Sequence, residues 1–159
     1  MEIRKIEGDR RQWMDLLLLG DEQEEMVNLY IDRGEMFALY DPAPQAVCIV
    51  TDEGEGLLEI KNIAVRPERQ RKGYGRNLIE FLLEYYSGRA KAIQAGTGDT
   101  PLTVPFYQAC GFTFSHRVPD FFLKHYDHPI YEAGVQLRDM VYFRKELPKT
   151  SAVSRQFLS

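Results

Sequence analysis

Cysteines and long apolar runs are scarce in this chain of 159 residues, and each scarcity excludes a class of protein. The two cysteines, Cys48 and Cys110, lie in apolar stretches without paired spacing, which predicts buried, reduced thiols and no disulfide framework. No apolar run approaches the roughly 20 residues that span a bilayer. The charged N-terminus lacks the apolar segment of a secretory signal, so we expect a cytoplasmic protein with no membrane partner.

Basic charge is also in short supply. Lys and Arg number 20 against 24 Asp and Glu, which gives a formal net charge of −4. Nucleic-acid binders usually carry a basic excess, so no nucleic-acid partner is expected. The three histidines, His116, His125 and His128, lack the close spacing of metal ligands, and no metal site is predicted.

What is present suits one folded domain. A chain of roughly 150 residues buries about 70% of the surface that its unfolded form exposes, which is enough for a core. We predict a single domain over residues 1–147 and a flexible tail over 148–159. Apolar periodicity and turn residues predict helices near 9–20, 21–33, 74–87 and 103–110, and strands near 2–6, 35–41, 45–52, 56–65, 91–96, 111–118 and 137–146. The fold class is therefore α/β, with a mixed, mostly antiparallel central sheet flanked by helices.

Two local expectations accompany this assignment. Asp21 is predicted to cap the second helix, whose inner face would hold Met26, Leu29 and Tyr30. Residues 119–134 are predicted to be irregular.

The most informative stretch follows the predicted strand 56–65. It is a basic loop that opens the next helix and reads Gln70-Arg71-Lys72-Gly73-Tyr74-Gly75-Arg76. A helix start has unpaired N–H groups and a partial positive charge, and glycine lets the backbone approach a ligand closely. This pattern favours a phosphate or pyrophosphate site. The alternative is a basic first turn whose glycines serve packing alone. Leu78 replaces the third glycine of a Rossmann fingerprint, and no Walker A sequence occurs.

The same loop resembles the Gln/Arg-x-x-Gly-x-Gly/Ala acyl-CoA motif of the GNAT N-acetyltransferase superfamily. Downstream, Phe106-Tyr107-Gln108-Ala109-Cys110-Gly111-Phe112 resembles the Phe-Tyr-x-x-x-Gly-Phe signature of that superfamily. The segment from Asp120 to Met140 is similar to a YvbK-like bacterial branch. The resemblance covers nearly the whole chain and implies the GNAT fold, with a V-shaped opening between the central strand and its parallel neighbour.

The resemblance also implies acetyl-CoA as cosubstrate, with the pantetheine arm along the central strand and the pyrophosphate on the loop amides. The residues that it assigns to this site are Ile63, Ala64, Val65, Gln70, Arg71, Lys72, Gly73, Tyr74, Gly75 and Arg76.

Tyr107 matches the family tyrosine that protonates the departing thiolate, although a tyrosine that only packs at the helix–strand corner is the alternative. Glu59 is the candidate base. A plain surface pair with Lys61, or a water relay in place of a dedicated base, remains open.

The segment before the last strand borders the acceptor site in the family. Its polar residues His125, Tyr126 and Glu132 either bind an amine or set the shape of the loop. The implied function is transfer of an acetyl group from acetyl-CoA to a primary amine by direct attack in a ternary complex. A non-catalytic acyl-CoA sensor or interaction module is the alternative. Edge strands of such sheets commonly pair, so a homodimer is possible.

Overall fold

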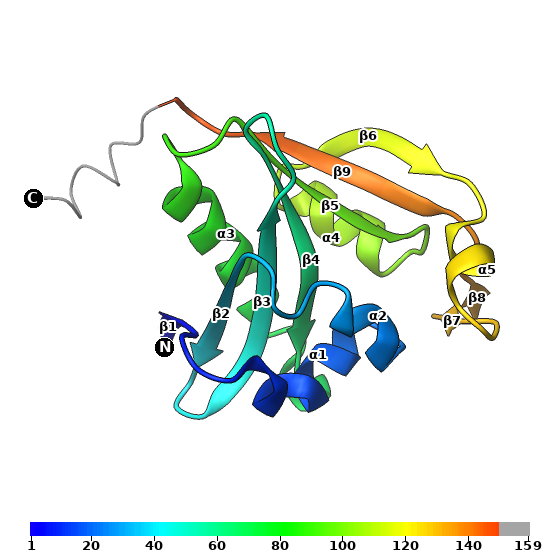
Figure 1. The fold of residues 1–159 in the computed structure, drawn as a ribbon, viewed down its shortest axis with the longest axis horizontal. Helices are drawn as coiled ribbons and strands as arrows, with labels where there is room; N and C mark the ends of the chain where they lie inside the picture. The colour runs from blue at the N-terminus through cyan, green and yellow to red at the C-terminus, as the bar shows by residue number, and fades with distance from the viewer. Residues whose placement is uncertain (150–159) are drawn as a thin grey trace, which may run out of the picture.

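The computed structural model describes residues 1–149, and its centre is a seven-stranded sheet in the order β1-β2-β3-β4-β5-β9-β6 (Figure 1). The strands are β1 (Glu2–Lys5), β2 (Glu35–Tyr40), β3 (Pro44–Asp52), β4 (Leu57–Val65), β5 (Ala92–Gly98), β6 (Thr113–Val118) and β9 (Met140–Glu146). Every neighbouring pair is antiparallel except β4 and β5, which run parallel. The predicted fold class is confirmed.

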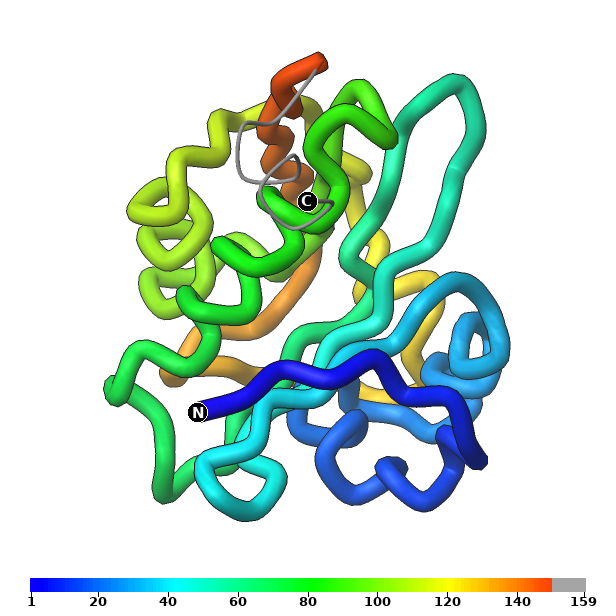
Figure 2. Tube along the Cα trace, turned by 90° about the vertical axis from the view of Figure 1, so that its left-hand side faces the viewer, coloured from blue at the N-terminus to red at the C-terminus, as the bar shows by residue number. Residues whose placement is uncertain are grey.

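Helices cover both faces of the sheet because alternate strand residues point to opposite sides. On one face, Phe37 and Cys48 pack in a core cluster with Leu78 of α3 and with Tyr107 of α4. On the other face, Met36 packs with side chains of the first two helices. The helices are α1 (Met14–Gly20), α2 (Glu24–Asn28), α3 (Tyr74–Tyr86) and α4 (Thr103–Ala109). Figure 2 shows α1 and α2 on one side of the strands and α3 and α4 on the other.

The central strand β4 separates from β5 halfway along its length. The two strands pair only from Leu57 opposite Ala92 to Ile60 opposite Ala95, and Figure 1 shows them diverging beyond that point. The register of β4 against β3 slips at the same place, which leaves Lys61 as the extra residue of a β-bulge. The bulge bends β4 away from β5, so within residues 1–149 the later part of β4 has no strand on that side. This is the V-shaped opening that the family resemblance implies.

The second helix differs from the prediction. α2 begins at Glu24 with Gln23 in the cap position, so the predicted Asp21 cap is wrong. Leu29 is 69% exposed and does not belong to the inner face, whereas Val27 is fully buried. The reason is competition from tertiary contacts, because the Asp21 carboxylate accepts hydrogen bonds from the side-chain hydroxyls of Tyr30 and Tyr126.

The segment predicted to be irregular contains regular structure. It holds α5 (Phe121–His125) and β7 (Tyr131–Glu132), which pairs with β8 (Val135–Gln136). Phe122, Ile130 and Leu137 form a small buried cluster under these elements. Elements of two to five residues are too short to show a periodic pattern, so the sequence did not reveal them.

The tail predicted from residue 148 is described only at its start. The Pro148 carbonyl accepts a hydrogen bond from the Gly88 backbone N–H at 2.9 Å, and residues 150–159 lie outside the described part of the chain. No helix among residues 1–149 is long and apolar enough to cross a membrane.

Candidate active site

The basic loop between β4 and α3 contains two residues with left-handed backbone conformation. These are Arg71, with φ of 65°, and Gly73, with φ of 84°. A Cβ on Gly73 would meet nothing within 4 Å, so the positive φ rather than crowding favours glycine there. Within residues 1–149, no backbone N–H from Arg71 to Arg76 donates to a backbone carbonyl; the Asn77 N–H bonds the Gly73 carbonyl at 2.9 Å. The loop therefore presents a run of unpaired donors, as an anion site requires.

The side chains of the loop add positive charge and fix its position. Arg71 and Lys72 are exposed and form no ion pair within the described residues, whereas Arg76 pairs with Glu80 at 3.1 Å. The Gln70 side-chain amide donates to the Val65 carbonyl at 3.3 Å. The loop thus keeps two uncompensated cations beside its free amides.

Gly75 has a different role from Gly73, since it permits close packing. A Cβ at this position would stand 3.3 Å from the Phe106 ring and 3.6 Å from Val65 Cγ2. The start of α3 therefore lies against both the end of β4 and the helix that carries Tyr107. Tyr74 donates its hydroxyl to Asp41 Oδ2 at 2.6 Å and anchors this corner to the β2–β3 turn.

Tyr107 is 5% exposed and lies among the rings of Phe106, Phe112 and Phe143. Burial raises the pKa of the Tyr107 hydroxyl well above its usual range. The group therefore keeps its proton at neutral pH, as a general acid must.

A cavity of about 320 Å³ lies at the mouth of the β4–β5 opening. Its lining includes Asp21, Glu59, Lys61, His125, Tyr126 and Tyr142. The structure thus brings together three residues that the sequence singled out: Glu59, His125 and Tyr126. Neither Tyr107 nor Glu132 belongs to the lining. Glu132 is half-buried, and burial followed by the nearby charge of Glu22 raises the pKa of its carboxyl group.

Glu59 is 8% exposed, and both of its carboxylate oxygens have partners. Lys61 Nζ lies 2.8 Å from Oε2, and Gln94 Nε2 donates to Oε1 at 2.7 Å. The pair with Lys61 that the sequence left open is therefore present, but it lines a cavity instead of lying on the open surface.

Sequence reasoning missed the opposite wall of this cavity. A Cβ on Gly96 would stand 2.8 Å from the Tyr142 ring, so glycine makes room for that tyrosine across the strands. Burial, with smaller contributions from Glu59 and Glu53, raises the pKa of Tyr142 to about 12. A glycine inside a predicted strand is the one signal that marked this close approach.

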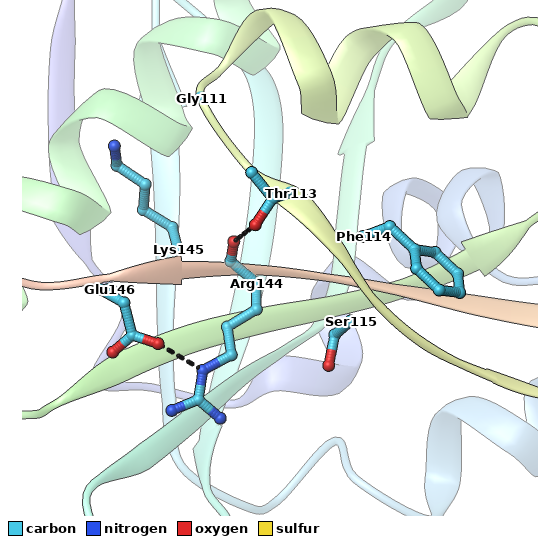
Figure 3. A pocket seen from close by; sticks show the side chains of 7 residues that line it. All are labelled: Gly111, Thr113, Phe114, Ser115, Arg144, Lys145 and Glu146. Carbon is cyan, nitrogen blue, oxygen red and sulfur yellow. Dashed lines mark hydrogen bonds and ion pairs between the residues drawn. The ribbon is translucent and has the colours of Figure 1, made fainter.

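A second hollow of about 440 Å³ lies on the outer strands β6 and β9 (Figure 3). Thr113, Phe114 and Arg144 contribute to its lining, and Arg144 Nε pairs with Glu146 Oε1 at 2.8 Å. Gly111 of the Phe-Tyr-x-x-x-Gly-Phe signature also lines this hollow, but none of the predicted catalytic, cosubstrate-binding or acceptor-binding residues does. Among the described residues, no group of three His, Cys, Asp or Glu side chains is arranged to hold a metal ion.

Comparison with known proteins agrees with this geometry. Residues 32–114 match the family model described as acetyltransferase (GNAT) domain. The N-acetyltransferase YvbK of Bacillus subtilis strain 168 is 38% identical over 130 residues, which cover 80% of this chain and 84% of the relative. The chain belongs to the GNAT acetyltransferase family. Its identity to YvbK supports the predicted placement in that bacterial branch.

Solved structures give the same result. A B. subtilis acetyltransferase in complex with CoA is 35% identical, with a TM-score of 0.83 over 91% of this chain and 97% of the other. A GNAT acetyltransferase of Elizabethkingia anophelis with acetyl-CoA bound is 28% identical, with a TM-score of 0.86 over 92% and 97% of the two chains. The predicted class of enzyme is confirmed.

Proposed function

We propose that this protein transfers an acetyl group from acetyl-CoA to a primary amine, by direct attack of the amine in a ternary complex. One observation carries the proposal: the unpaired edge of β4 leads from the cavity at Lys61 to the basic loop that begins beyond Val65. A cosubstrate bound along this edge has its phosphates at one end and its thioester at the other. The CoA and acetyl-CoA complexes of the two similar acetyltransferases support this arrangement.

The fit of acetyl-CoA rests on the donors that the chain leaves unpaired. The free amides from Arg71 to Arg76, with the Arg71 and Lys72 charges, would hold the pyrophosphate. The backbone groups of Ile63 and Val65 would hydrogen-bond the amides of the pantetheine arm, as an added strand pairs with a sheet edge. Ala64, between them, pairs with Val47 of β3.

The chemistry needs three contributions from the chain. A backbone N–H on the unpaired edge of β4, near the cavity end, donates to the thioester carbonyl oxygen as negative charge develops there. Glu59 accepts the proton of the attacking amine, directly or through a water. Tyr107 donates a proton to the departing sulfur. A C–N bond forms and the C–S bond breaks, so the products are the N-acetylated acceptor and the CoA thiol.

An acceptor screen tests the proposal. Purified protein, acetyl-CoA and a panel of amines are incubated, and release of the free thiol is measured against a control without amine. We expect amine-dependent thiol release. A thermal shift with CoA but no thiol release with any amine would favour the non-catalytic sensor. No thermal shift with CoA or acetyl-CoA would overturn the assignment of the loop.

A further inference from the structure

Of the Asp, Glu, Lys and Arg side chains that line the cavity, all but Asp21 have an ion-pair partner within residues 1–149; the partner of Arg33 is Glu53, outside the lining. Arg33 Nη2 lies 2.9 Å from Glu53 Oε2, and Lys61 Nζ lies 2.8 Å from Glu59 and 3.9 Å from Glu53. These two cations and two carboxylates balance one another. Asp21 also lines the cavity, and within residues 1–149 it forms no ion pair. The Asp21 carboxylate therefore faces the cavity without an opposite charge beside it.

Neutral hydrogen bonds hold the Asp21 carboxylate in a fixed orientation. The Tyr126 hydroxyl donates to Oδ1 at 2.6 Å, and the Tyr30 hydroxyl donates to Oδ2 at 3.0 Å. Asn62 Nδ2 donates to the Tyr30 oxygen at 2.9 Å, which directs the Tyr30 proton toward Asp21. Burial, and then Asp21 itself, raises the pKa of both tyrosines, so they remain donors. The carboxylate is thus positioned before any ligand arrives.

The surroundings of Asp21 suit a small organic cation. The rings of Phe121, Tyr126 and Tyr142 and the side chain of Met140 line the same cavity. Aromatic faces attract ammonium groups, and they do so more strongly where water is excluded. The cavity volume of about 320 Å³ leaves room for a compact acceptor.

We propose that Asp21 binds a cationic group of the acceptor other than the amine that is acetylated. The attacking nitrogen must be neutral, so the charge that Asp21 balances belongs to a second group. The preferred acceptors are then compact amines with a second cationic centre, such as aliphatic diamines. This inference rests on the proposed function and specifies its substrate class.

An acceptor with a carboxylate is the competing possibility, since Arg33 and Lys61 also line the cavity. Both cations already have carboxylate partners, and an anion would have to displace those partners or share the cations with them. A cation at Asp21 meets no such competition.

Three acceptors with the same five-carbon chain separate these possibilities: pentylamine, cadaverine and 5-aminovalerate. We expect kcat/KM to be highest for cadaverine. Asp21→Asn keeps the size of the side chain and should lower kcat/KM for cadaverine by about 10- to 100-fold, the usual effect of losing a hydrogen-bonded charge. The same variant should change kcat/KM for pentylamine by less than about threefold, and KM for acetyl-CoA should not change.

Glu22→Gln is the matched control, because it removes the same charge one residue away at an exposed position outside the lining. Because the Glu22 charge acts on Tyr126 from outside the cavity, the variant should lower kcat/KM for cadaverine by less than about threefold and leave the other two acceptors unaffected. Tyr126→Phe keeps the ring and removes one donor to Asp21, so it should raise KM for cadaverine with little change in kcat. If Asp21→Asn lowers the melting temperature strongly, the KM of Tyr126→Phe for cadaverine is compared with that of the wild-type protein instead.

Each other outcome overturns a definite part of the argument. Equal kcat/KM for pentylamine and cadaverine, or equal effects of Asp21→Asn and Glu22→Gln, overturns the role of Asp21. A preference for 5-aminovalerate would mean that Arg33 and Lys61 select the acceptor, and it also overturns the role of Asp21. Absence of thiol release with every amine contradicts the proposed function. In that case, calorimetric titration of cadaverine into the CoA-bound protein tests the Asp21 site directly. The site is refuted if the wild-type protein does not bind cadaverine, or if Asp21→Asn binds it with the same affinity.

Discussion

The basic loop and the acceptor cavity are the two ends of one proposed site, but they are built from different parts of the polypeptide. The loop offers backbone N–H groups of consecutive residues, positioned by one helix start. The cavity is lined by side chains from the α1–α2 turn, α2 and the segment after it, β4, α5 and the residue that follows it, and β9, together with Gly96 of β5. A site made of backbone depends on local conformation and tolerates many side chains, whereas a site made of side chains can change its ligand through single substitutions.

The largest expected effect concerns Tyr107, which belongs to neither the basic loop nor the lining of the acceptor cavity. Tyr107→Phe keeps the ring among Phe106, Phe112 and Phe143 and removes only the hydroxyl. Positioned acid catalysis is typically worth about 100- to 10,000-fold, and water can replace part of it, so kcat should fall at least about tenfold. Steady-state kinetics at saturating acetyl-CoA measures this, with Kd for acetyl-CoA and the melting temperature unchanged.

Because burial raises the pKa of Tyr107, its proton should remain in place up to alkaline pH, and loss of this proton should not limit activity near neutrality. Wild-type kcat in Tyr107→Phe, measured where chemistry limits the rate, would make the tyrosine a packing residue.

Charge reversal in the loop should affect the cosubstrate alone. Arg71→Glu combined with Lys72→Glu should weaken acetyl-CoA binding about tenfold or more, which corresponds to at least about 1.4 kcal/mol. The remaining affinity should depend less on salt, since fewer opposite charges attract the phosphates. Isothermal titration at two salt concentrations measures both effects.

Arg89→Glu with Lys91→Glu, beyond the C-terminal end of α3, is the matched control. A similar loss of affinity in this control would mean that net charge, and not the loop, attracts the ligand.

Substitution of His125 tests the acceptor cavity. The His125 ring packs against Phe121, with centroids 4.5 Å apart, and both residues line the cavity. His125→Ala should raise the acceptor KM about three- to tenfold and change KM for acetyl-CoA by less than about twofold. Equal changes in both constants, or only a lower melting temperature, would assign His125 to the shape of the loop.

The smallest expected effect concerns backbone conformation. Gly73→Ala places a Cβ at a positive φ and should cost about 1 kcal/mol, which lowers Tm by roughly 2–4 °C. Gly8→Ala is the control, because a Cβ there also meets nothing within 4 Å and no positive φ is involved. Differential scanning calorimetry should give a lower Tm for Gly73→Ala than for Gly8→Ala. Identical Tm values would show that the left-handed conformation of Gly73 carries no measurable penalty.

The difference between the two ends also explains how far the sequence could predict them. Gly73 and Gly75 mark the loop within a few residues, and β4 and α3 were predicted to within one residue at each end. The cavity depends on contacts such as Tyr126 with Asp21, which are 105 positions apart. A short-range pattern favoured Asp21 as a helix cap because aspartate suits that role locally. Only the tertiary structure shows that two tyrosine hydroxyls bind it instead.

The insert that carries Tyr126 begins and ends at a single position of the sheet, where Val118 of β6 pairs with Met140 of β9. Its small core of Phe122, Ile130 and Leu137 lies within the insert itself. Changing the length of such a closed loop costs little, since the closure entropy grows only with the logarithm of its length. Residues 119–139 can therefore be regarded as a replaceable module. Evolution or protein engineering could exchange this module to obtain a new acceptor specificity, while the sheet, the strand opening and the phosphate loop are inherited unchanged.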